Sequence, residues 1–219
     1  AVGYGAGVAV TTGVSNNLIG GLAGDALTTG SYNQALGVAA LSADTQGSRS
    51  IAIGHAALMT QNFTSATNPY NVAIGHNAGL ALTIGQSTTL VGGLSGDAIT
   101  TGMENTGVGY KSLSGTTTGG YNTGLGSRAL DGNTTASYNV GIGYNTLASN
   151  TTGAYNTAVG SVALDANTTA SNNTAVGYAS LGNSTGANNT AVGNYALVAN
   201  KPGDTNNAIG KDTMATTNP

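Results

Sequence analysis

The chain has no cysteine, no tryptophan and a single phenylalanine, and only 6% of its 219 residues are charged. The missing cysteine excludes disulfide bonds and thiolate metal sites. One phenylalanine and three methionines cannot fill a conventional core, so the interior must be built from smaller side chains. No run approaches eighteen consecutive apolar residues, so we expect no membrane insertion. The net charge of −3 and the five scattered Lys and Arg residues predict no nucleic-acid partner.

The 36 glycines reveal an internal repeat, which argues against a disordered chain. The repeat is clearest where Asn-Thr-Ala-Val-Gly recurs at 156–160, 173–177 and 189–193. Ten of the twelve intervals between its glycines are 17 residues, one is 21 and one is 16, and an aliphatic residue precedes every glycine. These repeat glycines are Gly3, Gly20, Gly37, Gly54, Gly75, Gly92, Gly109, Gly126, Gly143, Gly160, Gly177, Gly193 and Gly210.

A 17-residue period is too short for a helical-pair repeat or a propeller blade. It holds two strands of about four to six residues and two turns, which is one rung of a β-solenoid. The sequence therefore predicts an all-β fold, a parallel β-solenoid (β-roll) of about thirteen 17-residue coils that forms a single repeat domain over 1–219. Equivalent residues should stack about 4.8 Å apart.

The repeat also predicts which side chains hold the coils together. Stacked Asn side chains can form amide ladders, and Gly fits crowded corners. The predicted ladder residues are Asn122, Asn139, Asn156, Asn173 and Asn189, with Gly126, Gly143, Gly160, Gly177 and Gly193. The aliphatic residue before each glycine and the Leu four residues after it predict the core, as Ile142, Val159, Val176, Val192, Leu147, Leu164 and Leu181.

The sidedness of the repeat predicts self-association. In Asn-Thr-Ala-Val-Gly, Thr and Val point to one face of a strand and Ala to the other. Both faces carry small side chains that are not strongly polar, as in a strand covered on both sides. A two-stranded roll has only one interior, so we expect another copy of the chain to cover the second face.

The repeat resembles a known family. Asn-Thr-Ala-Val-Gly resembles the Asn-Ser-Val-Ala-Ile-Gly motif of the YadA-like head repeats of trimeric bacterial autotransporter adhesins, although the repeats here are longer. The longer motif Asn-Thr-Ala-Val-Gly-Tyr-x-x-Leu, with an Asn-Thr-Thr-Gly connection, is similar to repeat arrays in phage tail-fibre proteins. The resemblance covers essentially the whole chain. It implies a left-handed parallel β-roll, usually a homotrimer, that presents a rigid attachment surface.

Two histidines raise the question of a metal site. His55 and His76 each follow a repeat glycine in consecutive coils, so stacking brings them together as candidate transition-metal ligands. The competing interpretation, which we favour, is one more flat polar side chain, because other coils place tyrosine there. We therefore predict no metal and no cofactor. The tyrosines at this position are Tyr4, Tyr110, Tyr144 and Tyr178.

The interval from Gly54 to Gly75 carries four extra residues between Thr60 and Tyr70. Inserted loops on a solenoid are places where binding groups gather, which makes Phe63, Pro69 and Tyr70 a candidate binding loop. A tolerated surface insertion is the alternative, and we favour it because lengthening a loop costs little stability.

Five tyrosines share the position before the ladder asparagine. They can form an aromatic stripe that binds a glycan or a partner fibre, or they can shield the edge of the ladder. The sequence leaves both interpretations open. These residues are Tyr32, Tyr70, Tyr121, Tyr138 and Tyr155.

The sequence shows no nucleophile, base and orienting group together, so we predict a non-enzymatic protein. We expect a structural or adhesive fibre segment, extracellular on a virion (phage tail fibre) or a bacterial surface, that binds copies of itself and a cell-surface receptor or glycan. Because the sequence shows no signal peptide and no initiator Met, we expect it to be either processed or a segment of a longer fibrous protein. One alternative is a subunit of a self-assembling filament. A weaker alternative is an ice-binding protein, since Thr pairs recur at 134–135, 151–152 and 168–169.

Overall fold

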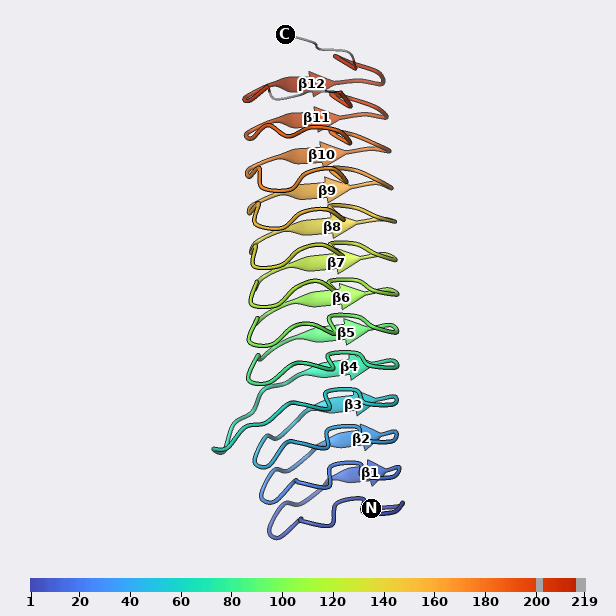
Figure 1. Ribbon diagram of the computed structural model, residues 1–219, viewed down its shortest axis with the longest axis vertical. Helices are drawn as coiled ribbons and strands as arrows, with labels where there is room; N and C mark the ends of the chain where they lie inside the picture. Colours follow the sequence, from blue (N-terminus) through green and yellow to red (C-terminus); the bar gives the residue numbers. More distant parts are fainter. Residues whose placement is uncertain (200–202, 216–219) are drawn as a thin grey trace.

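The computed structural model describes residues 1–199 and 203–215, and that part of the chain contains strands and turns but no helix. Its strands form one parallel sheet in which neighbours follow sequence order from β1 to β12. Figure 1 shows the coils stacked one above another, with the strands keeping nearly the same direction along the whole stack. The prediction of an all-β parallel β-solenoid is confirmed.

Each coil contributes one three-residue strand that ends just before a repeat glycine. The described residues form twelve strands instead of thirteen, because the first coil adds only an isolated bridge between Val2 and Ile19. The strands are β1 (Asn17–Ile19), β2 (Gln34–Leu36), β3 (Ile51–Ile53), β4 (Val72–Ile74), β5 (Thr89–Val91), β6 (Thr106–Val108), β7 (Thr123–Leu125), β8 (Val140–Ile142), β9 (Thr157–Val159), β10 (Thr174–Val176), β11 (Thr190–Val192) and β12 (Asn207–Ile209).

Equivalent residues of successive coils pair as the repeat predicted. In β9, Val159 is in register with Ile142 of β8 and with Val176 of β10. Thr174 pairs with Thr190 across the one 16-residue interval, so the missing residue is absorbed outside the strands. The strands thus keep one register from β1 to β12 even where the repeat length changes.

The other half of each coil is a run of turns, whereas the 17-residue period had predicted a second strand. The backbone there repeatedly takes positive φ angles, such as 56° at Ala39 and 55° at Leu41, and a β-strand requires negative ones. Coils still bond to each other on this side. The N–H of Leu41 donates to the carbonyl of Ala57 at 3.0 Å, and that of Ala43 donates to the carbonyl of Met59 at 3.0 Å.

The repeat glycine lies where successive coils approach most closely. At Gly160 the φ angle is 131°, and a Cβ atom added there would lie 2.5 Å from the carbonyl oxygen of Gly177. A side chain at this position would therefore meet backbone that cannot move aside. The glycines predicted for the crowded corner all have such contacts, at Gly126, Gly143, Gly160, Gly177 and Gly193.

The interior is filled from both halves of the coil. Leu147, Leu164 and Leu181, four residues after their glycines, are fully buried, as predicted. The central residue of every strand is also buried, and it is usually Ala or Gly. The core is therefore a single file of leucines packed against small residues on the inner side of the sheet.

The other half of the predicted core is wrong. Ile142 is 39% exposed and Val176 and Val192 are each 36% exposed, while Val159 is half-buried, so these residues lie on the outer side of the sheet. The leucine after the glycine occupies the interior and leaves room only for a small side chain at the centre of the strand.

Two coils in which the large and the small residue are exchanged between these positions support this explanation. Where Gly24 replaces that leucine, the strand centre is Leu18, whose Cδ2 atom would lie 2.9 Å from a Cβ added at Gly24. Leu90 fills the space at Gly96 in the same way, at 2.6 Å. A large side chain occupies the strand centre only where the facing position has none, because both positions share one interior volume.

The predicted asparagines are buried and join the coils, but their bonds differ from the predicted amide ladder. Each Oδ1 atom accepts a hydrogen bond from a backbone N–H of the next coil, and each Nδ2 atom donates to a carbonyl of that coil. For Asn173 the partners are the N–H of Asn189 at 2.9 Å and the carbonyl of Gly186 at 3.0 Å. The ladder thus runs mainly from side chain to backbone. The same pattern holds at Asn122, Asn139, Asn156 and Asn189.

A true amide ladder exists at another position, seven residues after the glycine, which sequence reasoning missed. Asn150 donates through Nδ2 to Oδ1 of Asn133 at 2.9 Å, and Asn167 donates to Asn150 at 2.9 Å. The ladder stops at Ser184, the equivalent residue of the next coil. The Oγ atom of Ser184 and the Oδ1 atom of Asn167 are both buried without a hydrogen-bond partner.

Candidate attachment surface

The outer side of the sheet, here called the sheet face, is formed by the first and third residues of each strand. All twelve third residues are aliphatic, and none of the outward side chains is charged. Six of the seven strands from β5 to β11 begin with threonine, the exception being β8 with Val140. The side chains are half-buried or exposed in the isolated chain. The result is an uncharged surface of aligned threonines and aliphatic residues along the stack.

Every tyrosine of the chain lies on the surface, with exposed fractions from 39% to 87%. Because tyrosine can add bulk to a core, its complete exclusion from this small interior indicates a surface role. The tyrosines border the sheet face on both sides. Five precede the ladder asparagine at the entry to a strand, four directly follow a repeat glycine, and Tyr195 lies two residues after one.

Three tyrosines at the entry side form a closed stack, here called the tyrosine stack. The ring centroids of Tyr121 and Tyr138 are 4.9 Å apart, and those of Tyr138 and Tyr155 are 5.0 Å apart, with nearly parallel planes. Glu104 holds the same repeat position one coil before Tyr121, at the N-terminal end of the tyrosine stack. Its carboxylate raises the pKa of Tyr121, and Tyr138 adds to this effect. Since the rings cover one another's faces, the stack presents mainly ring edges to solvent. This geometry favours the shielding interpretation over a sugar-binding stripe.

In the N-terminal part of the chain, Arg49 occupies the repeat position that Tyr32 and Tyr70 hold in the neighbouring coils. The Arg49 guanidinium carbon lies 5.3 Å from the ring centre of Tyr32 and 6.0 Å from that of Tyr70. Arg49 also donates to Oδ1 of Asn68 at 2.8 Å. The cation is thus held between two aromatic faces, an arrangement that is attractive because the ring faces carry negative charge density.

The histidine pair does not form a chelating site in this structure. The rings of His55 and His76 stack with centroids 5.2 Å apart and planes 11° from parallel. Imidazole nitrogens bind a metal through lone pairs in the ring plane, and parallel planes do not converge on one ion. Residues 1–199 and 203–215 contain no group of three or more His, Asp or Glu side chains that could hold a metal ion.

The predicted binding loop turns its apolar residues inward. Phe63 is only 6% exposed and Pro69 is buried, whereas Tyr70 is exposed. Phe63 and Pro69 therefore do not present themselves to a ligand, because both side chains pack under the loop. The loop projects from the stack between β3 and β4 (Figure 1), and residues 64–66 form its exposed part.

A buried carboxylate anchors this loop. Oδ1 of Asp44 accepts bonds from the N–H groups of Gly47 and Phe63, each at 3.0 Å, and Oδ2 accepts from the Gln61 amide at 2.6 Å. Gln61 in turn accepts a bond from Asn71 at 2.9 Å. Three donors around one carboxylate compensate for its burial.

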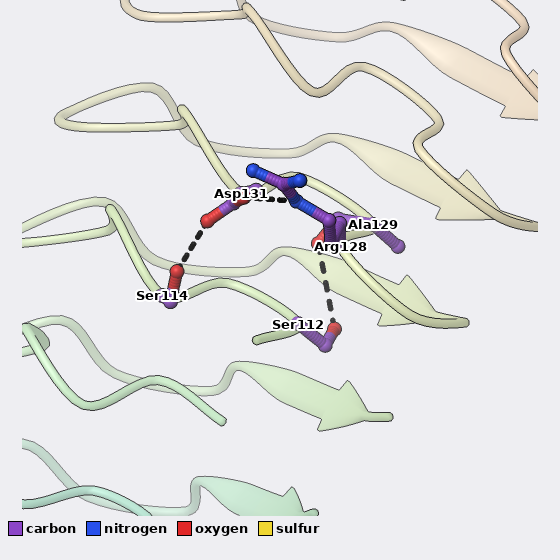
Figure 2. Close-up of polar contacts among 5 residues, drawn as sticks. All are labelled: Ser112, Ser114, Arg128, Ala129 and Asp131. Carbon is purple, nitrogen blue, oxygen red and sulfur yellow. Dashed lines mark hydrogen bonds and ion pairs between the residues drawn. The ribbon is translucent and has the colours of Figure 1, made fainter. Parts of the chain in front are cut away.

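A charged group lies beyond the exit side of the sheet (Figure 2). Nε of Arg128 contacts Oδ2 of Asp131 at 2.9 Å, and Oγ of Ser114 donates to Oδ1 of Asp131. The hydrogen bond to Asp131 raises the pKa of Arg128 above its ordinary value.

Two other carboxyl groups are perturbed by burial. Partial burial raises the pKa of Asp97, and the positive charge of Lys111 opposes this shift. Burial also raises the pKa of Asp165.

Comparison of the chain with models of protein families, with curated proteins and with solved structures found no match. No helix long and apolar enough to cross a membrane occurs in residues 1–199 and 203–215.

Proposed function

We propose that this chain is a non-enzymatic, extracellular fibre segment that gives a virion or a bacterial surface a rigid attachment rod. The observation that carries the proposal is the sheet face, an uncharged strip that continues over all twelve strands. Soluble proteins rarely leave such a strip uncovered. The resemblance to adhesin heads and phage tail fibres supports the same function.

A second copy of the chain is the occupant that best fits the sheet face. Eleven strand intervals of about 4.8 Å make it about 53 Å long, and three residues make it about 10 Å wide. With the bordering tyrosines the strip is about 20 Å wide and covers roughly 1,000 Å², against the roughly 800 Å² per partner of a stable interface. Tyrosine is also enriched in interfaces. We propose three parallel copies packed around a common axis, as the resemblance implies.

The mass of the particle in solution tests this assembly. We expect light scattering at low micromolar concentration to give three times the mass of one chain. Val159→Asp places a charge on the sheet face without entering the core, so it should reduce the mass to one chain while the circular dichroism spectrum keeps its β signal. Thr152→Asp, on an exposed turn outside the sheet, is the matched control and should remain assembled.

A stable, folded species of one-chain mass for the unmodified protein would contradict lateral packing. Particles whose length grows with concentration in electron micrographs would instead support the filament alternative.

Ice binding is a second candidate function, supported by a different set of threonines from those predicted. Oγ1 of Thr134 donates to the carbonyl of Thr151 at 2.9 Å, and Oγ1 of Thr151 donates to that of Thr168 at 3.0 Å, so these hydroxyls are already engaged. The threonines that begin six of the seven strands from β5 to β11 instead align hydroxyl and methyl groups at the regular strand spacing, as binding to a lattice requires. Ice and a second copy would compete for the same face. Thermal hysteresis in a one-chain species would support ice binding, and its absence would reject it.

A further inference from the structure

Two charged residues flank the same strand on opposite borders of the sheet face, here called the entry border (before each strand) and the exit border (after it). Glu104 lies on the entry border, two residues before β6, at the repeat position of Tyr121. Lys111 lies on the exit border, three residues after β6, and its Nζ atom is 5.9 Å from the ring centre of Tyr110. Both backbone N–H groups donate to carbonyls of the preceding coil, at 2.9 Å and 3.1 Å, so the coil holds an acid and a base at fixed places.

Neither of these charges has an ion-pair partner in residues 1–199 and 203–215. The ion pairs of that part of the chain involve Arg128 and Lys211 instead. Lys111 acts on the carboxyl group of Asp97 from a distance, and Glu104 is exposed. The strip between the two borders is about 20 Å wide, so Glu104 and Lys111 of one chain cannot meet across it.

A closed ring of parallel copies brings unlike borders together. Rotation about the long axis places the entry border of one copy against the exit border of the next, which is a heterologous contact. A closed ring involves no shift along that axis, so Glu104 of one copy and Lys111 of the next lie at the same height. A shift by one coil would offer Arg128 instead, but its Nε atom is already engaged by Asp131 at 2.9 Å (Figure 2).

We propose that Glu104 of each copy forms an ion pair with Lys111 of the next copy, and that these pairs orient the copies in the ring. This inference rests on the proposed assembly of parallel copies and names the side chains that direct it. The uncharged sheet face alone does not select an orientation, because apolar contacts are non-directional. Antiparallel packing about a two-fold axis would place like borders together, and the acid would then lose its base.

Chemical cross-linking tests the contact directly, because the chain has no cysteine of its own. In the double variant Glu104→Cys with Lys111→Cys, a short bis-maleimide should join chains into covalent dimers and trimers on a denaturing gel. Each single-cysteine variant should stay as separate chains, since a parallel ring keeps equivalent residues at different corners. Glu104→Cys with Thr152→Cys is the matched control and should also stay separate, because Thr152 lies on an exposed turn outside the sheet.

Charge reversal tests whether the contact is an ion pair. Glu104→Lys sets a cation against Lys111 of the next copy and should raise the concentration at which half of the trimer dissociates about tenfold. Adding Lys111→Glu to the same chain restores opposite charges and should recover the unmodified value. A double variant that assembles no better than Glu104→Lys would overturn the proposal.

The cross-linking results and the mass of the unmodified protein separate two kinds of failure. Cross-links in a single-cysteine variant, or equal cross-linking in the Thr152→Cys control, would reject the contact between Glu104 and Lys111. A three-chain mass without the expected cross-link would also reject this contact while the rod assembly stands. A one-chain mass would reject the assembly itself and the contact with it.

Discussion

Removal of one buried asparagine should have an effect that depends on its neighbours. Asn173 and Asn156 occupy the same position of adjacent coils, and each supports one N–H and one carbonyl of the next coil. In Asn173→Ala, the N–H of Asn189 and the carbonyl of Gly186 both lose their partner. In Asn156→Ala, the carbonyl of Ala170 keeps a second donor, the Asn167 amide at 3.0 Å.

The two substitutions are chemically identical, but the structure predicts a larger loss of stability for Asn173→Ala than for Asn156→Ala. Each buried backbone group left without a partner costs about 1–3 kcal/mol. Asn173→Ala should lower the free energy of unfolding by about 2–6 kcal/mol, whereas Asn156→Ala should lower it by about 1–3 kcal/mol. The larger value is a substantial part of the roughly 5–15 kcal/mol that stabilises a typical domain.

Urea denaturation followed by circular dichroism measures both variants under the same conditions. Hydrogen exchange should also show faster exchange at Asn189 in Asn173→Ala, because that N–H becomes unbonded. Thr169→Ala, which changes an exposed turn residue outside the sheet face, is the control and should stay within about 0.5 kcal/mol of the unmodified protein. If Asn156→Ala proves as destabilising as Asn173→Ala, the reasoning from bond partners fails.

Three further predictions concern buried or half-buried polar groups. Ser184→Asn extends the amide ladder to the unpartnered Oδ1 of Asn167 and should raise the free energy of unfolding by about 1 kcal/mol; a lower melting temperature would contradict this. Asp44→Ala removes the acceptor for the Phe63 N–H and the Gln61 amide and should make the 60–70 loop sensitive to proteolysis while the distant coils stay protected; protection of that loop would reject the anchoring role. Burial raises the pKa of Asp165 in the folded state above the unfolded value of about 3.9, so the folded state binds the proton more tightly and stability falls as pH rises through this window. Asp165→Asn should therefore gain stability relative to the unmodified protein as the pH rises above about 3.9, and parallel stability curves would count against it.

The period of the sequence was sufficient to predict the architecture and register. Stacking of Ile142, Val159 and Val176 follows from the constant spacing of their glycines, since a parallel stack places equivalent residues together. The direction of the strand side chains was not predicted correctly. Hydrophobicity alone favoured Val over Ala as the inner residue, and it failed because the interior is too narrow for two large side chains.

A signal for the correct orientation was present in the sequence. Leu18 and Leu90 occupy the strand centre in two of the four coils where glycine replaces the inner leucine, those of Gly24 and Gly96. At Gly79 the strand centre is Ala73, and Leu58 and Leu90 of the neighbouring coils fill the space. This exchange of volume between two repeat positions indicates that they face each other. The second strand of each coil was also predicted wrongly, because the positive φ angles of residues such as Leu147 have no glycine to reveal them.

The candidate site was predicted only in part. The tyrosines stood out in the sequence as repeated surface residues, and the histidine pair was expected to stack. The inward packing of Phe63 and Pro69 depends on contacts between coils, which loop composition alone does not specify.

The asparagine ladder makes the two sides of every coil different. The ladder asparagines Asn122, Asn139, Asn156, Asn173 and Asn189 bond through Oδ1 and Nδ2 to the backbone of the coil that follows in the sequence. The side of a coil that faces its successor therefore presents amide side chains, and the side that faces its predecessor presents the backbone N–H and carbonyl groups that bond to them. Two stacks of coils could continue this pairing only head to tail, because two like sides offer no such partners.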